Sequence, residues 1–513
     1  MAACSQTSQK TAAPSSASLD HYDAAVTQLL NEITKNPTSN DGGQVVWGTR
    51  YYLESLLVAY EATGNQKYVD AFVQTGNTVF NIVQHLTVLD VPDPSVIQPS
   101  NVSSAPTRDV TGWPTNIGTL GQPIPVPTAG GDISLYAQTL WPTPSTGSGY
   151  LQVSAAPAGG IVLNFELGGR VWQSYTAQTV NDLQGIAHQP IAYGATLGRI
   201  FPTGLGLPTP GLYALDTPLH AVWHAEQTGG ILLPFARLLL LAKSRPSIID
   251  SDTAMSWQSQ VVNIASSYEE EMLSDGNGGL VLTNAYWMPS PYAGLPVETD
   301  YINAEISLRM VLGLLTADQH QFDLAQGLLR HEMTKISMSS QNWLLIKESP
   351  DVPSWSQPND APYGAIWASY SGDNKSPESS TEGGFFVEAL QIASDNALGG
   401  KIGLTKQMCE GEKATFQGYL RIPAPGVNNS LIRSTYPTSN SQASDSPIPS
   451  NDPEDAARYA QPITENASFV CDNWNWMLKN GITTDEGVGH ILLDWARSEA
   501  AWKQLGSPDC PTQ

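Results

Sequence analysis

The sequence is poor in charge, and most of the charge that it carries is negative. Charged residues make up 14% of the chain, and 24 Lys and Arg residues face 48 Asp and Glu residues, for a net charge of −24. An average globular protein has roughly 25% charged residues. Because a negative surface repels phosphate, we expect neither nucleic acid nor anionic lipid headgroups as partners. The acidic balance fits solubility outside the cytoplasm and identifies no substrate.

Long apolar runs and the common cofactor motifs are also missing. The most apolar run, residues 231–242, is interrupted by Pro234 and Arg237. It falls short of the roughly 18 apolar residues that span a bilayer. The sequence has no Walker-type phosphate loop, no dinucleotide fingerprint after a strand and no nucleophile elbow around a serine. It therefore predicts a buried helix at residues 231–242 and no cofactor.

Cysteines are few, and the first of the four stands close to the start of the chain. Cys4 follows two small residues and precedes a stretch rich in Ser, Thr, Ala and Gln that lasts to about residue 18. This pattern resembles the end of a bacterial lipoprotein signal, in which the Cys carries lipid. On this interpretation residues 1–18 are a flexible tether and the protein is an exported, periplasmic or cell-surface lipoprotein, held at the outer membrane through Cys4. The alternative is an accidental Cys in a loose tail.

The other three cysteines, Cys409, Cys471 and Cys510, have spacings that fit no zinc pattern. In an oxidising compartment one pair could form a disulfide, for example Cys471 with Cys510, which would leave one thiol over. The sequence does not select the pair.

Helical periodicity dominates the chain outside residues 90–210. Tyr52, Leu56 and Tyr60 follow one another at i, i+4 and i+8, which places them on one face of a helix. Gly64 stands where a left-handed cap would end that helix, and a second helix follows from Tyr68. Residues 47–88 therefore predict a helical hairpin.

The same pattern recurs four times. The further predicted pairs are residues 231–243 with 254–272, 301–315 with 323–336, 384–393 with a helix near Ala414, and 469–479 with 487–505. No hairpin can bury its apolar face alone, so several must pack side by side. We predict a mainly α fold, an α/α toroid of hairpins, with its first hairpins in residues 19–89 and the remainder in residues 211–513.

Residues 90–210 break the helical pattern because they are rich in Pro, Thr, Gly and Ser. Residues 150–154, 160–165 and 171–175 alternate in polarity and contain β-branched side chains, as strands do. We predict a β-rich insertion over one mouth of the toroid. Residues 422–462 are also low in apolar residues and predict a rim loop or a partly disordered segment.

In a toroid the first turns of the inner helices, and the loops before them, face one cavity, so polar and aromatic residues there are candidates for a site. The first group is His220, Trp223, His224 and Glu226. The two histidines are spaced as a metal pair, but no Glu follows the first His as in a zinc protease helix, so we predict no metal. The remaining roles for a histidine of this group are those of a general base, a positioning group or a helix cap.

The second group combines aromatic rings with carboxylates. Tyr286 and Trp287 precede Tyr301 and Glu305, which share a helical face at i, i+4. Rings stack on the apolar face of a sugar while acidic groups accept hydrogen bonds from its hydroxyls. The alternative is that the rings pack in a wall and that Glu305 is solvated.

The third group lies before the predicted helix at residues 384–393. Trp367 and Tyr370 are followed by Glu378 and Glu382, which could act as acid and base. Equally, the two carboxylates could be N-terminal charges that favour the helix dipole.

The fourth group is Trp47, Arg50 and Tyr51. An arginine can clamp a substrate carboxylate through two parallel hydrogen bonds. Because basic residues are scarce in this chain, an arginine that lines a cavity would point to an anionic group on the substrate.

Residues 47–68, 226–237, 301–315 and 378–388 resemble bacterial α/α-toroid proteins related to the C-terminal region of D-glucuronyl C5-epimerases and to uronate polysaccharide lyases. The resemblance implies a polysaccharide substrate with uronic acids, and abstraction of the proton at C5 by a Tyr, His or Glu. A carboxylate-binding Arg would then favour the charge of the transition state.

We therefore predict an exported carbohydrate-active enzyme of the lyase or epimerase type. The alternatives are a glycoside hydrolase with paired carboxylates on the same toroid, and a surface lipoprotein that binds glycan without catalysis. The predicted catalytic residues are His224, Glu226, Tyr301, Glu305 and Glu382. The predicted substrate-binding residues are Trp47, Arg50, Tyr51, His220, Trp223, Tyr286, Trp287, Trp367, Tyr370 and Glu378.

Overall fold

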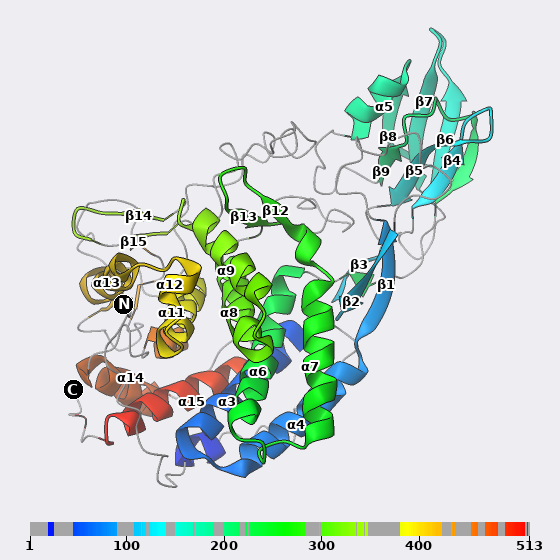
Figure 1. Ribbon diagram of the computed structural model, residues 1–513. Coiled ribbons are helices and arrows are strands. Elements are labelled where there is room, and N and C mark those ends of the chain that lie inside the picture. The colour runs from blue at the N-terminus through cyan, green and yellow to red at the C-terminus, as the bar shows by residue number, and fades with distance from the viewer. Residues whose placement is uncertain are drawn as a thin grey trace.

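The fold is mainly α, with helical hairpins on one side and the sheets of β4 (Ile124–Pro127) to β10 (Gly211–Ala214) on the other (Figure 1). The computed structural model describes residues 19–24, 45–89, 107–113, 115–119, 123–139, 149–167, 170–187, 198–215, 221–222, 225–283, 297, 299–334, 336–342, 344–346, 380–422, 432–433, 436, 453–459, 467–480, 488–507 and 510. No helix in these ranges is long and apolar enough to cross a membrane.

The first predicted hairpin is confirmed. A π-helical turn, η1 (Val45–Thr49), leads into α3 (Arg50–Thr63), and α4 (Gln66–Asn81) returns beside it. Gly64 ends α3 in the left-handed conformation, with φ of 67°, and its N–H donates to the carbonyl of Tyr60. Asn65 then caps α4 by accepting a hydrogen bond from the N–H of Lys67.

Three of the other four predicted hairpins are also present. They are α6 (Ala225–Ser244) with α7 (Ser251–Ser266), α8 (Thr299–Thr316) with α9 (Gln319–Glu332), and α14 (Ala467–Asn480) with α15 (Val488–Gln504). The two helices of the remaining pair, α11 (Ser380–Asp395) and α13 (Lys406–Thr415), both form, but α13 packs mainly against η5 and β15.

Short elements join these hairpins. The prediction that the return helix of the α6 hairpin runs to residue 272 is wrong, because the chain turns at η3 (Glu269–Glu271) into a two-stranded ribbon. Within the predicted loop at residues 422–462 lies η6 (Pro453–Tyr459). The remaining short elements are β12 (Met272–Ser274), β13 (Leu280–Leu282), β14 (Ser337–Met338), β15 (Leu344–Leu345), α12 (Gly399–Ile402) and η5 (Phe416–Leu420).

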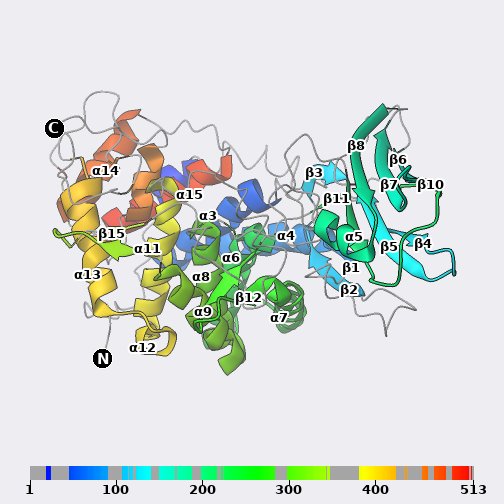
Figure 2. The same cartoon turned by 90° about the horizontal axis from the view of Figure 1, so that it is seen from above.

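One helix of each hairpin packs against the corresponding helix of the next. α3 packs against α15 and α6, α6 against α8, and α8 against α11, while η6 contacts both α11 and α15 (Figures 1 and 2). α4, α7, α9 and α14 each pack against their own hairpin partner. Helices from the two ends of the chain, α3 and α15, therefore lie side by side.

Aromatic side chains hold the first two hairpins together. The ring of Phe235 lies 4.5 Å from that of Phe80, 5.3 Å from that of Phe72 and 5.2 Å from that of Trp257, measured between ring centres. Such edge-on and tilted pairs stabilise a core beyond their buried area. Gly76 makes room for the cluster, because a Cβ there would lie 2.6 Å from the Trp257 ring.

The predicted β-rich segment forms antiparallel sheets with a core of their own. The predicted strands at residues 150–154, 160–165 and 171–175 correspond to β6 (Gly149–Ala155), β7 (Ile161–Leu167) and β8 (Arg170–Ala177). One sheet has the order β10-β6-β7-β8 and the other β4-β5-β9. The other elements here are β4 (Ile124–Pro127), β5 (Ile133–Thr139), α5 (Val180–Ala187), β9 (Gly198–Pro202) and β10 (Gly211–Ala214).

Two ribbons connect the β-rich part to the helices. β1 (Gln84–Leu89) continues from α4 and pairs with β2 (Thr107–Gly112), while β3 (Thr115–Thr119) pairs with β11 (Ala221–Val222), just before α6. Trp113 anchors this connection, since its indole N–H donates to the carbonyl of Val79 at 2.8 Å. Both views place the sheets to one side of the helices (Figures 1 and 2). That they cover a mouth of a toroid stays a prediction.

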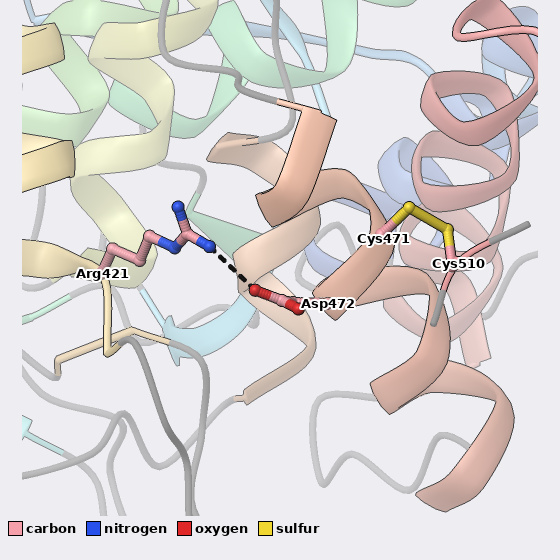
Figure 3. Close-up of a disulfide and its surroundings, with 4 residues drawn as sticks. All are labelled: Arg421, Cys471, Asp472 and Cys510. Carbon is pink, nitrogen blue, oxygen red and sulfur yellow. Dashed lines mark hydrogen bonds and ion pairs between the residues drawn. A yellow bond between two sulfur atoms is a disulfide. The ribbon is translucent and has the colours of Figure 1, made fainter. Parts of the chain in front are cut away.

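A disulfide joins Cys471 on α14 to Cys510, which follows α15 (Figure 3). This is the pair that the sequence offered as an example. Beside it, Arg421 donates to Asp472 of α14 at 2.8 Å (Figure 3). Cys409 is also disulfide-bonded. The expectation of a leftover thiol among these three cysteines is therefore wrong.

Candidate functional site

Charged side chains gather where the inner helices meet, although these helices are otherwise apolar. The group comprises Glu54 and Glu61 of α3, Arg237 of α6, Glu388 of α11 and Arg497 of α15. Glu54, Glu388 and Arg497 are buried. Burying ions is costly unless they are paired, so their pairing decides what this region can do.

The charges form a continuous chain of ion pairs. Arg497 pairs with Glu54 and lies 3.7 Å from Glu388 Oε1. Arg237 reaches the same Glu388 oxygen at 3.4 Å through Nη1, and its Nη2 donates to Glu61 at 2.9 Å. Glu388 therefore stands between two guanidinium groups that come from different helices.

The two buried carboxyls differ in protonation. Burial disfavours the charged form of Glu54, but the guanidiniums of Arg497, Arg50 and Arg237 outweigh it and lower the pKa of Glu54 to about 2. Burial and the charge of Glu54 raise the pKa of Glu388, and the nearby arginines offset only part of that rise. Of the two carboxyl groups, Glu54 therefore carries the charge more readily, and Glu388 holds a proton more readily than an ordinary glutamate.

Arg50 lies one turn before Glu54, at the start of α3, and only 2% of its surface is exposed. Its guanidinium carbon is 4.4 Å from the centre of the Phe385 ring and 5.0 Å from that of Tyr51. Its Nε and Nη2 are buried and have no hydrogen-bond partner. A buried donor without an acceptor costs about 1–3 kcal/mol, and more when it is charged. Arg50 is therefore suited to pair with an anion.

Arg458 of η6 brings a second guanidinium to the same two rings. It lies 4.6 Å from the centre of Phe385 and 5.8 Å from that of Tyr51, and it is 3% exposed. Two like charges on the same pair of rings repel each other, which increases the affinity of this place for an anion.

Two adjacent glycines let α6 approach its neighbours closely. A Cβ at Gly230 would collide with the guanidinium of Arg50, and a Cβ at Gly229 with the carboxylate of Glu305. Consecutive helical residues point in different directions, so the pair serves α3 on one side and α8 on the other. The charged side chains on the facing helices, Arg50 of α3 and Glu305 of α8, leave no room for a larger residue at either position.

The structure places two residues of the fourth predicted group against the helices that follow the first and third groups. Arg50 and Tyr51 lie against Gly230 of α6 and Phe385 of α11. The predicted catalytic residues Glu226 and Glu382 belong to the first turns of these two helices. Their side chains, and that of Trp47 in η1, are outside the described residues, as are Cys4, His220, Trp223, His224, Tyr286, Trp287, Trp367, Tyr370 and Glu378.

The predicted pair Tyr301 and Glu305 lies on α8. Tyr301 is partly buried and packs against the helical core. Glu305 is fully buried, with Oε1 accepting from Arg309 Nε at 2.5 Å and Oε2 from the Tyr268 hydroxyl at 3.1 Å. Arg309 in turn pairs with Glu269 of η3, which follows the outer helix α7. Glu305 thus has the partners of a structural carboxylate. The alternative prediction, that Glu305 is solvated, is wrong.

A cavity of about 420 Å³ lies at the opposite ends of the inner helices, where α3, α6, α11 and α15 finish. Arg237, Arg497, Glu61 and Glu388 line it, together with the polar side chains of Gln391, Asp395, Asn396 and Gln504. The prediction placed polar residues only at the beginnings of these helices and missed this cavity. A signal was present in the sequence, because Arg237 and Glu388 are isolated charges in otherwise apolar helices of a chain with few charges.

Within the described ranges no group of three or more His, Cys, Asp or Glu side chains could hold a metal ion. Comparison with protein-family models, with curated proteins and with solved structures found no match.

Proposed function

We propose that this protein is an exported enzyme that acts on a polysaccharide containing uronic acids, by abstraction of the proton at C5. The observation that carries the proposal is the buried Arg50 guanidinium, with two nitrogens that have no partner. A uronate carboxylate is the complementary group, because it accepts two parallel hydrogen bonds from a guanidinium fork.

The proposed architecture is an α/α toroid. The contacts of α3 with α6, of α6 with α8, of α8 with α11, of α11 and α15 with η6, and of α15 with α3 support a ring that closes on itself. In such a ring the first turns of α3, α6 and α11 share one mouth. The contacts of Arg50 with Gly230 and Phe385 are what this arrangement would require.

Local charge supports an anionic substrate even though the whole chain is strongly acidic. At the Arg50 end of the inner helices two buried guanidiniums, those of Arg50 and Arg458, lie against the same rings of Tyr51 and Phe385. A buried positive site inside an acidic protein selects for an anion that enters by specific hydrogen bonds rather than by general attraction.

The proposed chemistry follows from where charge develops. Removal of the C5 proton places negative charge on the adjoining carboxylate, and a guanidinium bonded to that carboxylate stabilises the transition state more than the ground state. Glu226 and Glu382, at the starts of α6 and α11, and His224 and Tyr301 are the proposed sources of the base and the acid. A proton returned to the opposite face gives an epimer, and loss of the C4 oxygen gives an unsaturated product.

A panel of uronate and neutral polysaccharides tests the proposal. Each digest is assayed for ultraviolet absorbance of unsaturated ends, for new reducing ends, and for deuterium at C5 in D₂O. Absorbance identifies a lyase and deuterium an epimerase. Reducing ends without absorbance identify a hydrolase, and binding without any product a non-catalytic glycan-binding protein. Either of the last two outcomes refutes the proposal.

Substitution of Arg50 ties the activity to the site. Two charge-assisted hydrogen bonds contribute about 3 kcal/mol, so Arg50→Leu should lower kcat/KM roughly 100-fold. Arg50→Lys, which keeps the charge but loses the fork, should lose less. Arg245→Leu is the matched control, since Arg245 is exposed in the turn between α6 and α7. Full activity in a folded Arg50→Leu protein would remove the basis of the proposal.

A hydrolytic mechanism that uses Glu54 and Glu388 as the pair of carboxyl groups is not supported. Glycoside hydrolases need two carboxyl groups about 5–9.5 Å apart, with the sugar between them. Glu54 and Glu388 both contact the same atom, Arg497 Nη2, so this guanidinium occupies the space between the two carboxyl groups.

A further inference from the structure

We infer that the cavity at the ends of α3, α6, α11 and α15 is a second binding site, and that it takes a neutral saccharide of one or two sugar units. The inference does not depend on the proposed function, because it rests on residues at the opposite ends of the inner helices from Arg50. Three features of the cavity support it.

The first feature is its size and its origin. Its volume of about 420 Å³ falls within the roughly 300–1,000 Å³ of small-molecule sites. Its walls come from five helices and η6, so the space is set by the packing of the whole helical part rather than by one loop. A site formed in this way is preorganised, which reduces the entropy lost when a ligand binds.

The second feature is a pair of unsatisfied polar atoms in the wall. Gln391 donates from Nε2 to Asp395 at 2.6 Å, which fixes its amide and leaves Oε1 buried without a partner. Arg497 is 7% exposed, and its Nε also lacks a hydrogen-bond partner. Both atoms are covered in the free protein, so a ligand in the cavity bonds to them only when the side chains of Gln391 and Arg497 shift toward it. A hydroxyl group can serve either of them, because it both donates and accepts.

The third feature is the balance of charge. Arg237 is already paired with Glu61 and Glu388, and Arg497 with Glu54 and Glu388. An ionic ligand would have to displace one of these pairs, whereas a neutral ligand can share their remaining hydrogen-bonding capacity. Leu240, Leu241 and Ile392 supply an aliphatic surface for the apolar face of a sugar ring. A neutral polyhydroxylated molecule is the class that meets all three conditions.

Titration calorimetry on the full chain tests the inference. The probes are cellobiose, maltose and lactose, with glucuronate and glucosamine as charged comparators. At least one neutral disaccharide should bind with one-to-one stoichiometry, and more tightly than either comparator.

Two substitutions locate the binding. Gln391→Leu removes the free acceptor, and Ala62→Phe fills the cavity from the last turn of α3. Each should weaken binding at least tenfold. The matched controls are Gln258→Leu and Ala254→Phe on the outer helix α7, which do not line the cavity, and both should bind as the wild type does.

The outcomes separate this inference from the proposed function. Arg50→Leu should leave disaccharide binding intact while it lowers activity on polysaccharide. The inference is overturned if no neutral disaccharide binds, if a charged comparator binds more tightly, or if binding is lost in Arg50→Leu but kept in both cavity variants. Loss of the polysaccharide activity alone would leave it standing.

Discussion

Glu412 should make the stability of this protein depend on pH in a range where ordinary glutamates do not titrate. Glu412 is fully buried in α13 and accepts a hydrogen bond from the Tyr436 hydroxyl at 2.8 Å. Its other oxygen has no partner. Burial raises its pKa from an ordinary 4.5 to about 8, and the bond from Tyr436 offsets only part of this rise.

The sign and size of the effect follow from linkage. The folded pKa is higher than the unfolded one, so the contribution of the protonated carboxyl to stability is complete below pH 4.5 and is lost as the pH rises through 8. Between pH 6 and pH 8 the folded form should lose about 2 kcal/mol relative to the unfolded chain, at 1.36 kcal/mol per unit of pKa difference.

Urea unfolding at pH 6, 7 and 8 measures this contribution. Glu412→Gln removes the titrating proton, so the fall in unfolding free energy over this range should be about 2 kcal/mol smaller than in the wild type. Glu410→Gln in the same helix is the control, since Glu410 is 65% exposed and pairs with Lys406. An unchanged pH slope in Glu412→Gln would show that the buried carboxyl does not hold a proton near neutrality.

Three further predictions concern the site and the disulfide. Gly230→Ala should lower activity at least tenfold in a folded protein, because the new methyl group displaces the Arg50 guanidinium, whereas Gly48→Ala, with open space around its Cα, should have full activity. His224→Ala and Glu226→Gln should each lower activity more than tenfold without a change in circular dichroism, and full activity in both would exclude this group from catalysis. Cys471→Ser should lower the free energy of unfolding by roughly 2–4 kcal/mol, since the disulfide closes a separation of 39 residues; equal urea midpoints for variant and wild type under oxidising conditions would contradict this.

The hairpins could be predicted because their signals are local. Apolar residues at i, i+4 and i+8 define a helical face, and a glycine, which adopts the left-handed conformation at the least cost, marks its end, as Gly64 does with φ of 67°. The strands were legible for the same reason, since polarity alternates within β6, β7 and β8. The boundary of α7 was wrong because the ribbon of β12 and β13, which ends that helix, depends on pairing across a turn.

The candidate site was only partly legible. The sequence singled out Arg50 because basic residues are scarce in this chain. That two of its nitrogens lack partners depends on its packing against Gly230 and Phe385, which are far away in the sequence. The role of Glu305 depends in the same way on Tyr268 and Arg309. The ion pair of Glu54 with Arg497 joins residues that are 443 positions apart. No local pattern encodes such a pair.

By itself, the sequence determined which segments are helices and strands, which turns join them, and that charge is rare. These properties depend on residues within a few positions of one another. Only the tertiary structure decided which of the rare charges meet, which of them lack partners, and where a cavity remains. The free energy of a buried ion depends on the groups that surround it in space, and those come from helices at both ends of the chain.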